Sequence, residues 1–194
     1  LGIHKDITVK QKLNLTNVRL WSLEDPYLYK VISVVKSDNQ IVHQTKTRFG
    51  IKTVKFDAKE GFFLNGNHLK IKGTNNHQDH AGIGSALPDY MQYYRIKLLK
   101  EMGSNAYRAS HNAPTPELLV VDEQRLLNSS PEYIDQFKRI LKRDRNHASV
   151  FLWSIGNEEQ NIQGNDYGKK IAQTLLAIQE DLDPTRTSTY AADM

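Results

Sequence analysis

The most informative part of this sequence is Ser149-Val150-Phe151-Leu152-Trp153-Ser154-Ile155-Gly156-Asn157-Glu158-Glu159. Its apolar run is too short for a free-standing helix and is rich in β-branched and aromatic residues, which predicts a parallel strand buried on both faces. Polarity changes abruptly where the run ends, so Gly-Asn-Glu would stand at the carboxyl edge of a parallel sheet, where such folds place their chemistry.

The two glutamates that follow this strand have different expected roles. Desolvation disfavours a charged carboxylate, so Glu158 at a half-buried strand exit suits a general acid. Successive residues of a strand point to opposite sides, and Glu158 and Glu159 are therefore not expected to serve one cavity equally. The alternative is a solvated turn that carries two surface glutamates.

The composition is that of a folded globular protein. Apolar residues make up 39% of the 194 residues and charged residues 25%, and 26 basic against 22 acidic residues give a formal charge of +4. The absence of cysteine excludes disulfides and thiolate zinc sites. No apolar run reaches the roughly 20 residues of a membrane span, so no membrane partner is expected. The start at Leu1 lacks an initiator methionine, and we interpret the chain as a segment of a longer protein.

One dense basic group lies in a predicted helix and comprises Lys138, Arg139, Lys142, Arg143 and Arg145. Apolar residues interrupt it at helical spacing. This pattern favours a solvated helix face over a nucleic-acid site, and no nucleic-acid partner is expected.

Residues 1–56 have the pattern of a β-domain. Loose alternation predicts strands at 6–15, 27–35 and 41–49, and the polar run 37–40 predicts a hairpin turn between the last two. Strands without intervening helices indicate an antiparallel sandwich, in whose core Trp21 is expected to pack.

Residues 57–194 have the pattern of parallel β/α units. A strand at 52–56 and a hairpin with Asn65-Gly66 at its tip come first. Strands are then expected at 69–73, 105–109, 119–123, 149–157 and 187–191. Helices are expected from Pro88 to about Gly103 with Met91, Tyr94, Leu98 and Met102 on the buried face, over 114–119, from Ser130-Pro131 to about 145, and over 166–182.

Polar side chains gather where each of these strands is expected to end. They are Asn75, Asn76, His77, Asp79 and His80, then Arg108, Ser110, His111 and Asn112, then Asp122 and Glu123, then Asn157 and Glu158, and finally Asp193. Such a set, without a glycine-rich phosphate loop, suits a polyhydroxylated neutral ligand, and carbohydrate cleavage requires one carboxylic acid and a second carboxylate. A divalent metal is the alternative, although no spacing matches a ligand motif.

Several motifs, in this order, resemble glycoside hydrolase family 2. They are Trp21-Ser22 with Asp25-Pro26-Tyr27-Leu28-Tyr29, Arg48-Phe49-Gly50-Ile51, Phe63-Leu64-Asn65-Gly66, Lys72-Gly73-Thr74-Asn75-Asn76-His77, Asn105-Ala106-Tyr107-Arg108-Ala109-Ser110-His111, Asp144-Arg145-Asn146-His147 and Trp153-Ser154-Ile155-Gly156-Asn157-Glu158-Glu159. The resemblance implies an immunoglobulin-like β-sandwich, incomplete at its start, over 1–56, and the first part of a (β/α)₈ TIM barrel over 57–194.

The resemblance also implies a retaining mechanism. Glu158 matches the acid/base and Asn157 the neighbour that binds the sugar 2-hydroxyl. The remaining matched substrate-binding positions are Asn75, His77, Arg108, His111, Asp122 and Glu123. The family's nucleophile lies on a later strand, beyond Met194, and about ten family residues are missing between Leu119 and Val120. Asn76 and Asn112 stand where relatives often have Arg and Tyr.

Gly156-Asn157-Glu158-Glu159 followed by Gln160 looks most like the bacterial β-galactosidases, so a terminal β-D-galactoside is the expected substrate. Activity on a β-glucuronide or β-mannoside is the first alternative, and a non-catalytic sugar-binding or assembly module is the second. The family implies Mg²⁺ or Na⁺ near the acid/base, for which no ligands are assigned here. A homo-oligomer stays open, as does the compartment, cytoplasmic or periplasmic for a bacterial protein.

Overall fold

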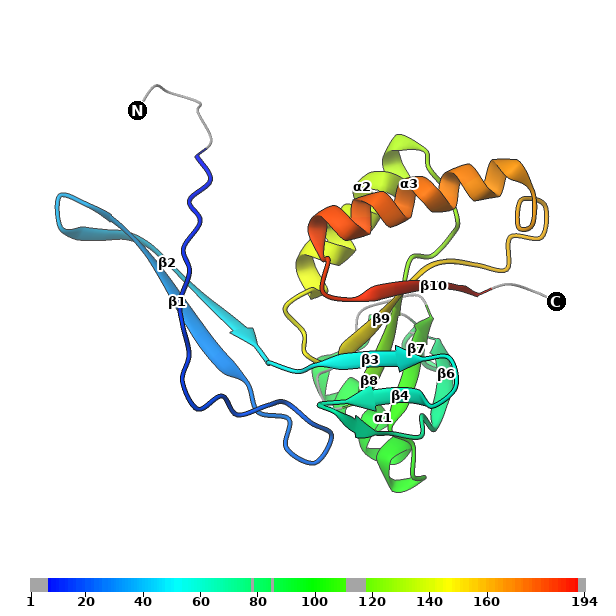
Figure 1. The fold of residues 1–194 in the computed structure, drawn as a ribbon, viewed down its shortest axis with the longest axis horizontal. Helices are drawn as coiled ribbons and strands as arrows, with labels where there is room; N and C mark the ends of the chain where they lie inside the picture. The colour runs from blue at the N-terminus through cyan, green and yellow to red at the C-terminus, as the bar shows by residue number, and fades with distance from the viewer. Residues whose placement is uncertain (1–6, 78, 85, 111–117, 192–194) are drawn as a thin grey trace.

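A computed structural model describes residues 7–77, 79–84, 86–110 and 118–191 of the chain. Its centre is a parallel five-stranded sheet in the order β10-β9-β8-β7-β6 (Figure 1). The strands are β6 (Gly73–His77), β7 (Ala106–Ser110), β8 (Leu119–Glu123), β9 (Val150–Asn157) and β10 (Thr187–Ala191). The segment from 149 therefore forms a central strand, and the chain runs through the sheet in sequence order, as expected of consecutive β/α units.

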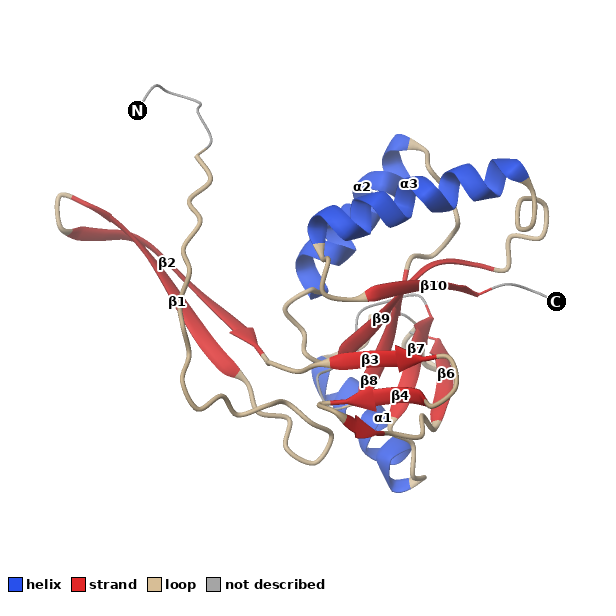
Figure 2. Cartoon of the chain, in the orientation of Figure 1, coloured by secondary structure: helices blue, strands red, loops and turns tan. Residues whose placement is uncertain are grey.

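The helices are α1 (Asp89–Glu101), α2 (Pro131–Asp144) and α3 (Asp166–Leu182). Figure 2 shows α2 and α3 side by side along one face of the sheet. Phe137 and Leu141 of α2 and Ile171 and Leu175 of α3 are buried there against the strands, in one cluster with Trp153. The predicted bounds of these two helices are confirmed.

The predicted buried face of α1 is wrong. Ile96 is the buried residue of this helix, whereas Tyr94, Leu98 and Met102 are exposed. Apolar residues occur on several faces of α1, so their spacing did not identify which face packs. Gly103 follows the helix with φ +86°, the left-handed conformation expected of a residue that ends a helix.

A short antiparallel sheet covers the amino ends of the parallel strands. It consists of β3 (Val54–Asp57), β4 (Gly61–Leu64) and β5 (Asn67–His68), and Asn65 and Gly66 between β4 and β5 have φ values of 52° and 80°. These positive angles are what the Asn-Gly pair predicts. Phe62 packs edge-on against Phe151 at 5.1 Å, in a cluster with Leu119. The carboxyl ends of the strands, at the opposite edge, are left for a site.

Trp21 packs against this end of the sheet rather than in a sandwich. Its side chain is fully buried in the cluster that holds Phe62, Ala148 and Phe151. Lys52 makes a second link, because its Nζ donates to the carbonyl of Ala148 and, at 2.8 Å, to that of Val150. Burial, reinforced by the charge of Arg186, lowers the pKa of Lys52 well below its usual range.

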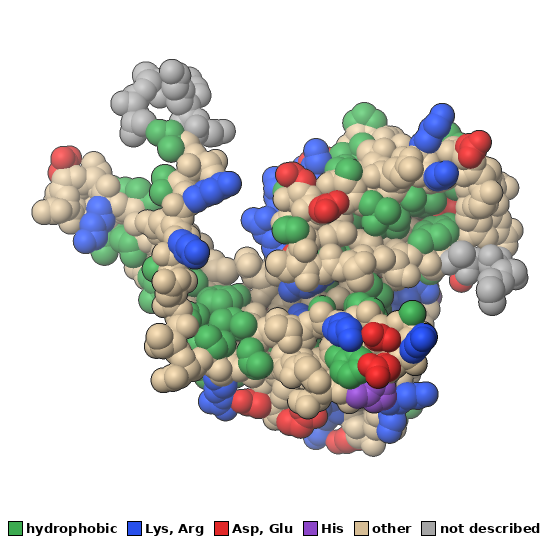
Figure 3. Space-filling view, viewed as in Figure 1, with side chains coloured by type: hydrophobic (Ala, Val, Ile, Leu, Met, Phe, Trp, Pro, Cys, Tyr) green, Lys and Arg blue, Asp and Glu red, His purple; other side chains and the backbone are tan. Residues whose placement is uncertain are grey.

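The β1 (Tyr29–Ser37) and β2 (Gln40–Phe49) strands form a separate antiparallel hairpin that extends away from the sheet (Figure 1). The predicted turn is confirmed, with Asp38 and Asn39 at positive φ. Hydrophobic side chains lie exposed on this hairpin (Figure 3). They include Ile32, Val34, Val35, Ile41 and Val42. Within the described ranges, no helix is both long and apolar enough to cross a membrane.

Two strand predictions are wrong. Residues 7–15 contain no strand, and Val9 and Leu13 are about three-quarters exposed, because an alternating segment becomes a strand only where a neighbour accepts its hydrogen bonds. The first parallel strand begins at Gly73 rather than at Leu69, so Asn75 and His77 lie within β6 and not after it.

Candidate active site

Polar side chains from four adjacent strands meet on one face of the sheet. Arg108 on β7 donates from Nε to Oε2 of Glu123 on β8 at 2.5 Å and from Nη2 to Oδ1 of Asn157 at the end of β9. Asn75 on β6 pairs in register with Arg108 and accepts a hydrogen bond from Ser110 Oγ. The parallel register thus joins residues far apart in the sequence at the carboxyl half of the sheet.

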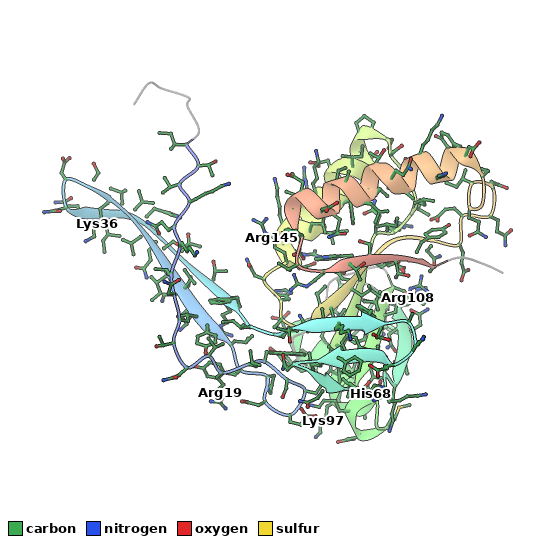
Figure 4. The ribbon with its side chains drawn as sticks, in the orientation of Figure 1. Arg19, Lys36, His68, Lys97, Arg108 and Arg145 are labelled. Atoms are coloured by element: carbon green, nitrogen blue, oxygen red, sulfur yellow. The ribbon has the colours of Figure 1, made fainter. Side chains whose placement is uncertain are left out.

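The Arg108–Glu123 ion pair is the rigid part of this arrangement. The Glu123 side chain is completely buried and that of Arg108 is 22% exposed, so a full negative charge inside the protein is matched by a guanidinium with several donors. Arg108 also donates to Asn157. The guanidinium group, which is held in place by Glu123, therefore fixes the orientation of the Asn157 amide. Figure 4 labels Arg108 at the opposite end of the sheet from Arg145, which follows α2.

Asp122 lies on the other face of β8, as strand alternation requires. It is buried against Asp144 at the end of α2, whose carboxylate also binds the Arg143 guanidinium at 2.6 Å. Desolvation, with the charge and hydrogen bond of Asp144, raises the pKa of Asp122 well above its usual range. The structure therefore separates Asp122 from Glu123, although the sequence motif places them together.

Glu158 follows β9 directly and is exposed rather than half-buried, so the expected desolvation of its carboxyl is not found. Its φ is +40°, which is uncommon for a residue other than glycine. Glu158 lines a pocket of about 490 Å³ together with Leu126, Leu127 and Asn128 of the loop after β8. In the described part of the chain, no hydrogen bond links its carboxyl to Arg108 or Asn157.

Glu159 lines the same pocket as Glu158, so the expectation that alternation would separate the two glutamates is not met; β9 ends at Asn157, before either of them. Its carboxylate accepts hydrogen bonds from the backbone N–H of Leu127 at 2.9 Å, from that of Asn157 at 3.0 Å and from the Tyr190 hydroxyl at 3.0 Å. Sequence reasoning missed Tyr190, which reaches Glu159 from β10. Burial raises the pKa of Tyr190, and the carboxylate of Glu159 adds to this, which keeps the hydroxyl protonated as a donor.

The remaining predicted positions are only partly placed. His77 is exposed at the end of β6, and its carbonyl accepts a hydrogen bond from Arg95 at 2.7 Å. His111 lies outside the described residues. Among the residues that are described, no three His, Asp or Glu side chains gather as metal ligands. The described residues thus supply no set of three such ligands for Mg²⁺ or Na⁺.

Comparison with known proteins places this geometry in a family. A model described as "Glycosyl hydrolases family 2, TIM barrel domain" matches residues 54–127 and 117–194, and one described as "Glycosyl hydrolases family 2" matches residues 2–52. The two barrel matches overlap at 117–127, where the sequence indicated missing family residues.

Individual relatives carry several substrate names. The chain is 36% identical over 175 residues to beta-galactosidase BoGH2A of Bacteroides ovatus, covering 79% of this chain and 21% of that protein. It is 32% identical over 161 residues to a beta-glucuronidase of Formosa agariphila, covering 74% and 16%. The crystal structure of a beta-glycosidase from Bacteroides vulgatus superposes with a TM-score of 0.74 at 34% identity, covering 89% and 24%.

The chain thus spans a quarter or less of the length of these three relatives. Within that span it holds an antiparallel hairpin of the immunoglobulin-like domain and an open five-stranded part of the TIM barrel, and the Arg108–Glu123–Asn157 arrangement lies at the carboxyl half of the barrel strands. The chain therefore belongs to glycosyl hydrolases family 2.

Proposed function

We propose that the protein containing this chain is a retaining glycoside hydrolase that cleaves terminal β-D-galactosides, with Glu158 as its acid/base. One observation carries the proposal. Asn157, next to Glu158, is oriented by an arginine that is itself anchored on a buried carboxylate. A surface turn has no need of an ion pair buried for the sake of one amide, whereas a sugar site needs a fixed donor beside its acid.

The chemistry is a double displacement. A carboxylate nucleophile from a later barrel strand attacks the anomeric carbon while Glu158 gives its proton to the departing oxygen, and the aglycone leaves as an alcohol. Glu158, now a carboxylate, removes a proton from water, whose oxygen attacks the same carbon and displaces the nucleophile. The sugar leaves with its original anomeric configuration, and both carboxyl groups return to their starting states.

Asn157 is assigned to the 2-hydroxyl of the sugar. Its Oδ1 accepts from Arg108, so its side-chain NH₂ is the group that can donate to the substrate. A hydrogen bond at this hydroxyl strengthens in the transition state and so lowers the barrier rather than only tightening binding. Asn75 and His77 are assigned to the sugar from β6. Glu123 acts through Arg108, and the contact of His111 with substrate stays a prediction.

The charge of the site favours a neutral sugar. Of the side chains described on this face, Arg108 is the cation, and it is already paired with Glu123, whereas Glu158 adds a further acidic group. A uronic acid would bring its own carboxylate and would need another cation. The galactoside is preferred on the resemblance of Gly156-Asn157-Glu158-Glu159-Gln160 to the bacterial β-galactosidases, and a β-glucuronide is the second candidate because a relative bears that name. A β-mannoside, an alternative substrate suggested by the sequence resemblance, is the third candidate. That the protein forms a homo-oligomer stays a prediction.

The test uses the full-length protein that contains this chain and 4-nitrophenyl β-galactoside, β-glucuronide and β-mannoside. The galactoside should give the largest kcat/KM. Glu158→Gln should lower kcat/KM by about 10²–10⁴-fold for poor leaving groups, which need the proton, and much less for activated ones, whose departure does not need it. Glu180→Gln, an exposed change on α3, is the control. Full activity of Glu158→Gln would refute the acid/base assignment, and a larger kcat/KM on the glucuronide would refute the galactoside.

A further inference from the structure

The turn after β9 has a conformation that its own sequence does not favour. Glu158 lies in the left-handed region, which is sterically unfavourable for a residue other than glycine. Such a conformation persists only where surrounding contacts determine it. The contacts that hold this turn therefore bear directly on where the Glu158 side chain can lie.

The backbone N–H groups of three successive residues in the turn are all bonded. Asn157 N–H donates to the Glu159 carboxylate, at 3.3 Å to Oε1 and 3.0 Å to Oε2. Glu158 N–H donates to the carbonyl of Ala191 at 2.8 Å. Glu159 N–H donates to the Tyr190 hydroxyl at 3.2 Å. Two of the three bonds thus come from the side chains of Glu159 and Tyr190.

The same two side chains connect the turn to its neighbours. Glu159 Oε1 accepts from the N–H of Leu127, which fixes the loop after β8, and Glu159 Oε2 accepts from the hydroxyl of Tyr190 on β10. Gly156 lets Leu127 and Tyr190 approach the end of β9, because a Cβ at residue 156 would lie 2.7 Å from Leu127 Cβ and 2.9 Å from Tyr190 Cε2. The Glu159 carboxylate therefore connects the end of β9 with the loop after β8 and with β10.

We propose that Glu159 and Tyr190 are positioning residues that hold the turn at Glu158 in the shape required for proton transfer to the leaving group. The proposal rests on the acid/base role of Glu158 proposed above. Neither side chain needs to touch substrate, because both act through the backbone of residues 157–159. A glutamine at 159 would present an NH₂ group to N–H donors and would lose part of this arrangement, although its size is unchanged.

The test compares two leaving groups on the same sugar, 2,4-dinitrophenyl and methyl, in the full-length protein. Activated dinitrophenyl departs without a proton, whereas methoxide needs one. Glu159→Gln and Tyr190→Phe should each lower the ratio of kcat/KM for the methyl glycoside to kcat/KM for the dinitrophenyl glycoside, by up to about 10²-fold. The ratio is independent of how much enzyme is folded, because the concentration of active enzyme cancels.

Matched controls are Glu180→Gln and Tyr167→Phe, both exposed on α3, which should leave the ratio unchanged. A double variant should lose less than the two single losses combined, since Glu159 and Tyr190 act as a unit. Amide hydrogen exchange at Leu127 and Asn157 should become faster in Glu159→Gln, and unaltered exchange would overturn the proposal.

Glu158→Gln belongs in the same series, so that two failures can be told apart. If Glu158→Gln does not lower the ratio, the acid/base assignment fails and this proposal fails with it. If Glu158→Gln lowers the ratio and neither Glu159→Gln nor Tyr190→Phe does, the acid/base stands and the positioning role alone is refuted.

Discussion

Replacing Trp21 by alanine should destabilise the barrel segment, although Trp21 lies far from it in sequence. The side chain is completely buried between Phe62, Leu64, Ala148 and Phe151. Removing a buried tryptophan costs about 3–5 kcal/mol through lost burial and the cavity left behind. The Lys52 Nζ lies over the ring, 5.7 Å from its centroid, and is part of the same packing.

One effect opposes this loss. The indole Nε1 is buried and has no hydrogen-bond partner among the described residues, and a buried donor without a partner costs about 1–3 kcal/mol. Alanine removes that penalty. We therefore expect a net loss of about 3 kcal/mol in the free energy of unfolding for Trp21→Ala. The burial term wins because it involves the whole ring system, whereas the penalty involves one N–H group.

Urea unfolding followed by tryptophan fluorescence measures this directly. Trp153, the other tryptophan of this chain, is buried on the helix side of the sheet and remains as a reporter of the same segment in Trp21→Ala. Trp21→Phe keeps most of the apolar volume and loses the N–H group, and it should cost much less. Leu13→Ala, at a site 76% exposed, is the surface control. A loss below about 1 kcal/mol in Trp21→Ala would refute the packing argument.

Three further changes test other parts of the structure. Arg108→Lys should lower the free energy of unfolding by about 3 kcal/mol and also lower kcat/KM, because one ammonium cannot bridge buried Glu123 and Asn157; thermal unfolding and kinetics on the same sample check both. Gly156→Ala should cost about 1–3 kcal/mol in urea unfolding, because its methyl group would overlap Leu127 and Tyr190. Asp122→Asn should gain stability relative to the wild type as pH rises. The pKa of Asp122 is raised in the folded chain beside Asp144 and Arg143, so the folded chain keeps a proton that the unfolded chain has lost. The stability that the protonated Asp122 contributes is fully present below the unfolded pKa of about 3.9 and is lost as pH rises through the folded pKa. Urea unfolding of both proteins from about pH 4 to 7 measures that trend, and a constant difference between them would contradict it.

Local sequence signals predicted the elements whose causes are local. The strand at β9 follows from a continuous apolar run, and α3 ends at Leu182 because Asp183 precedes a proline. Asn65-Gly66 predicted its turn in the same way. The sequence predicts β6 too early because its residues, Gly73-Thr74-Asn75-Asn76-His77, are polar, and among the described strands they pair with β7 alone. The domain boundary at residues 56 and 57 stays a prediction.

Long-range contacts account for what the sequence could not predict. Trp21 has the composition of a core residue, but nothing in the first 56 residues indicates that its partners are Phe62 and Phe151. The hydrogen bond between Glu159 and Tyr190 likewise joins residues 31 positions apart. Strand alternation, by contrast, predicts that Asp122 and Glu123 point to opposite faces of β8. Applied to these two residues, it assigns Glu123 to the site and Asp122 to the other face, where Asp122 is buried against Asp144.

The end of β9 combines two sets of contacts. β9 ends at Asn157 and Glu158 has a φ of +40°, so strand alternation, which would place Asn157 and Glu159 on one face, does not continue through the turn. Asn157 faces the Arg108–Glu123 pair, and Glu159 faces Tyr190 and Leu127 from the other side. Glu158 lies between them, where neither set of contacts uses its carboxyl. A residue that must exchange a proton with substrate needs a carboxyl group that is not engaged in structural hydrogen bonds. The geometry at residues 157–159 thus separates support from chemistry: the neighbours on each side carry the contacts that fix the backbone, and the exposed residue between them stays available to react.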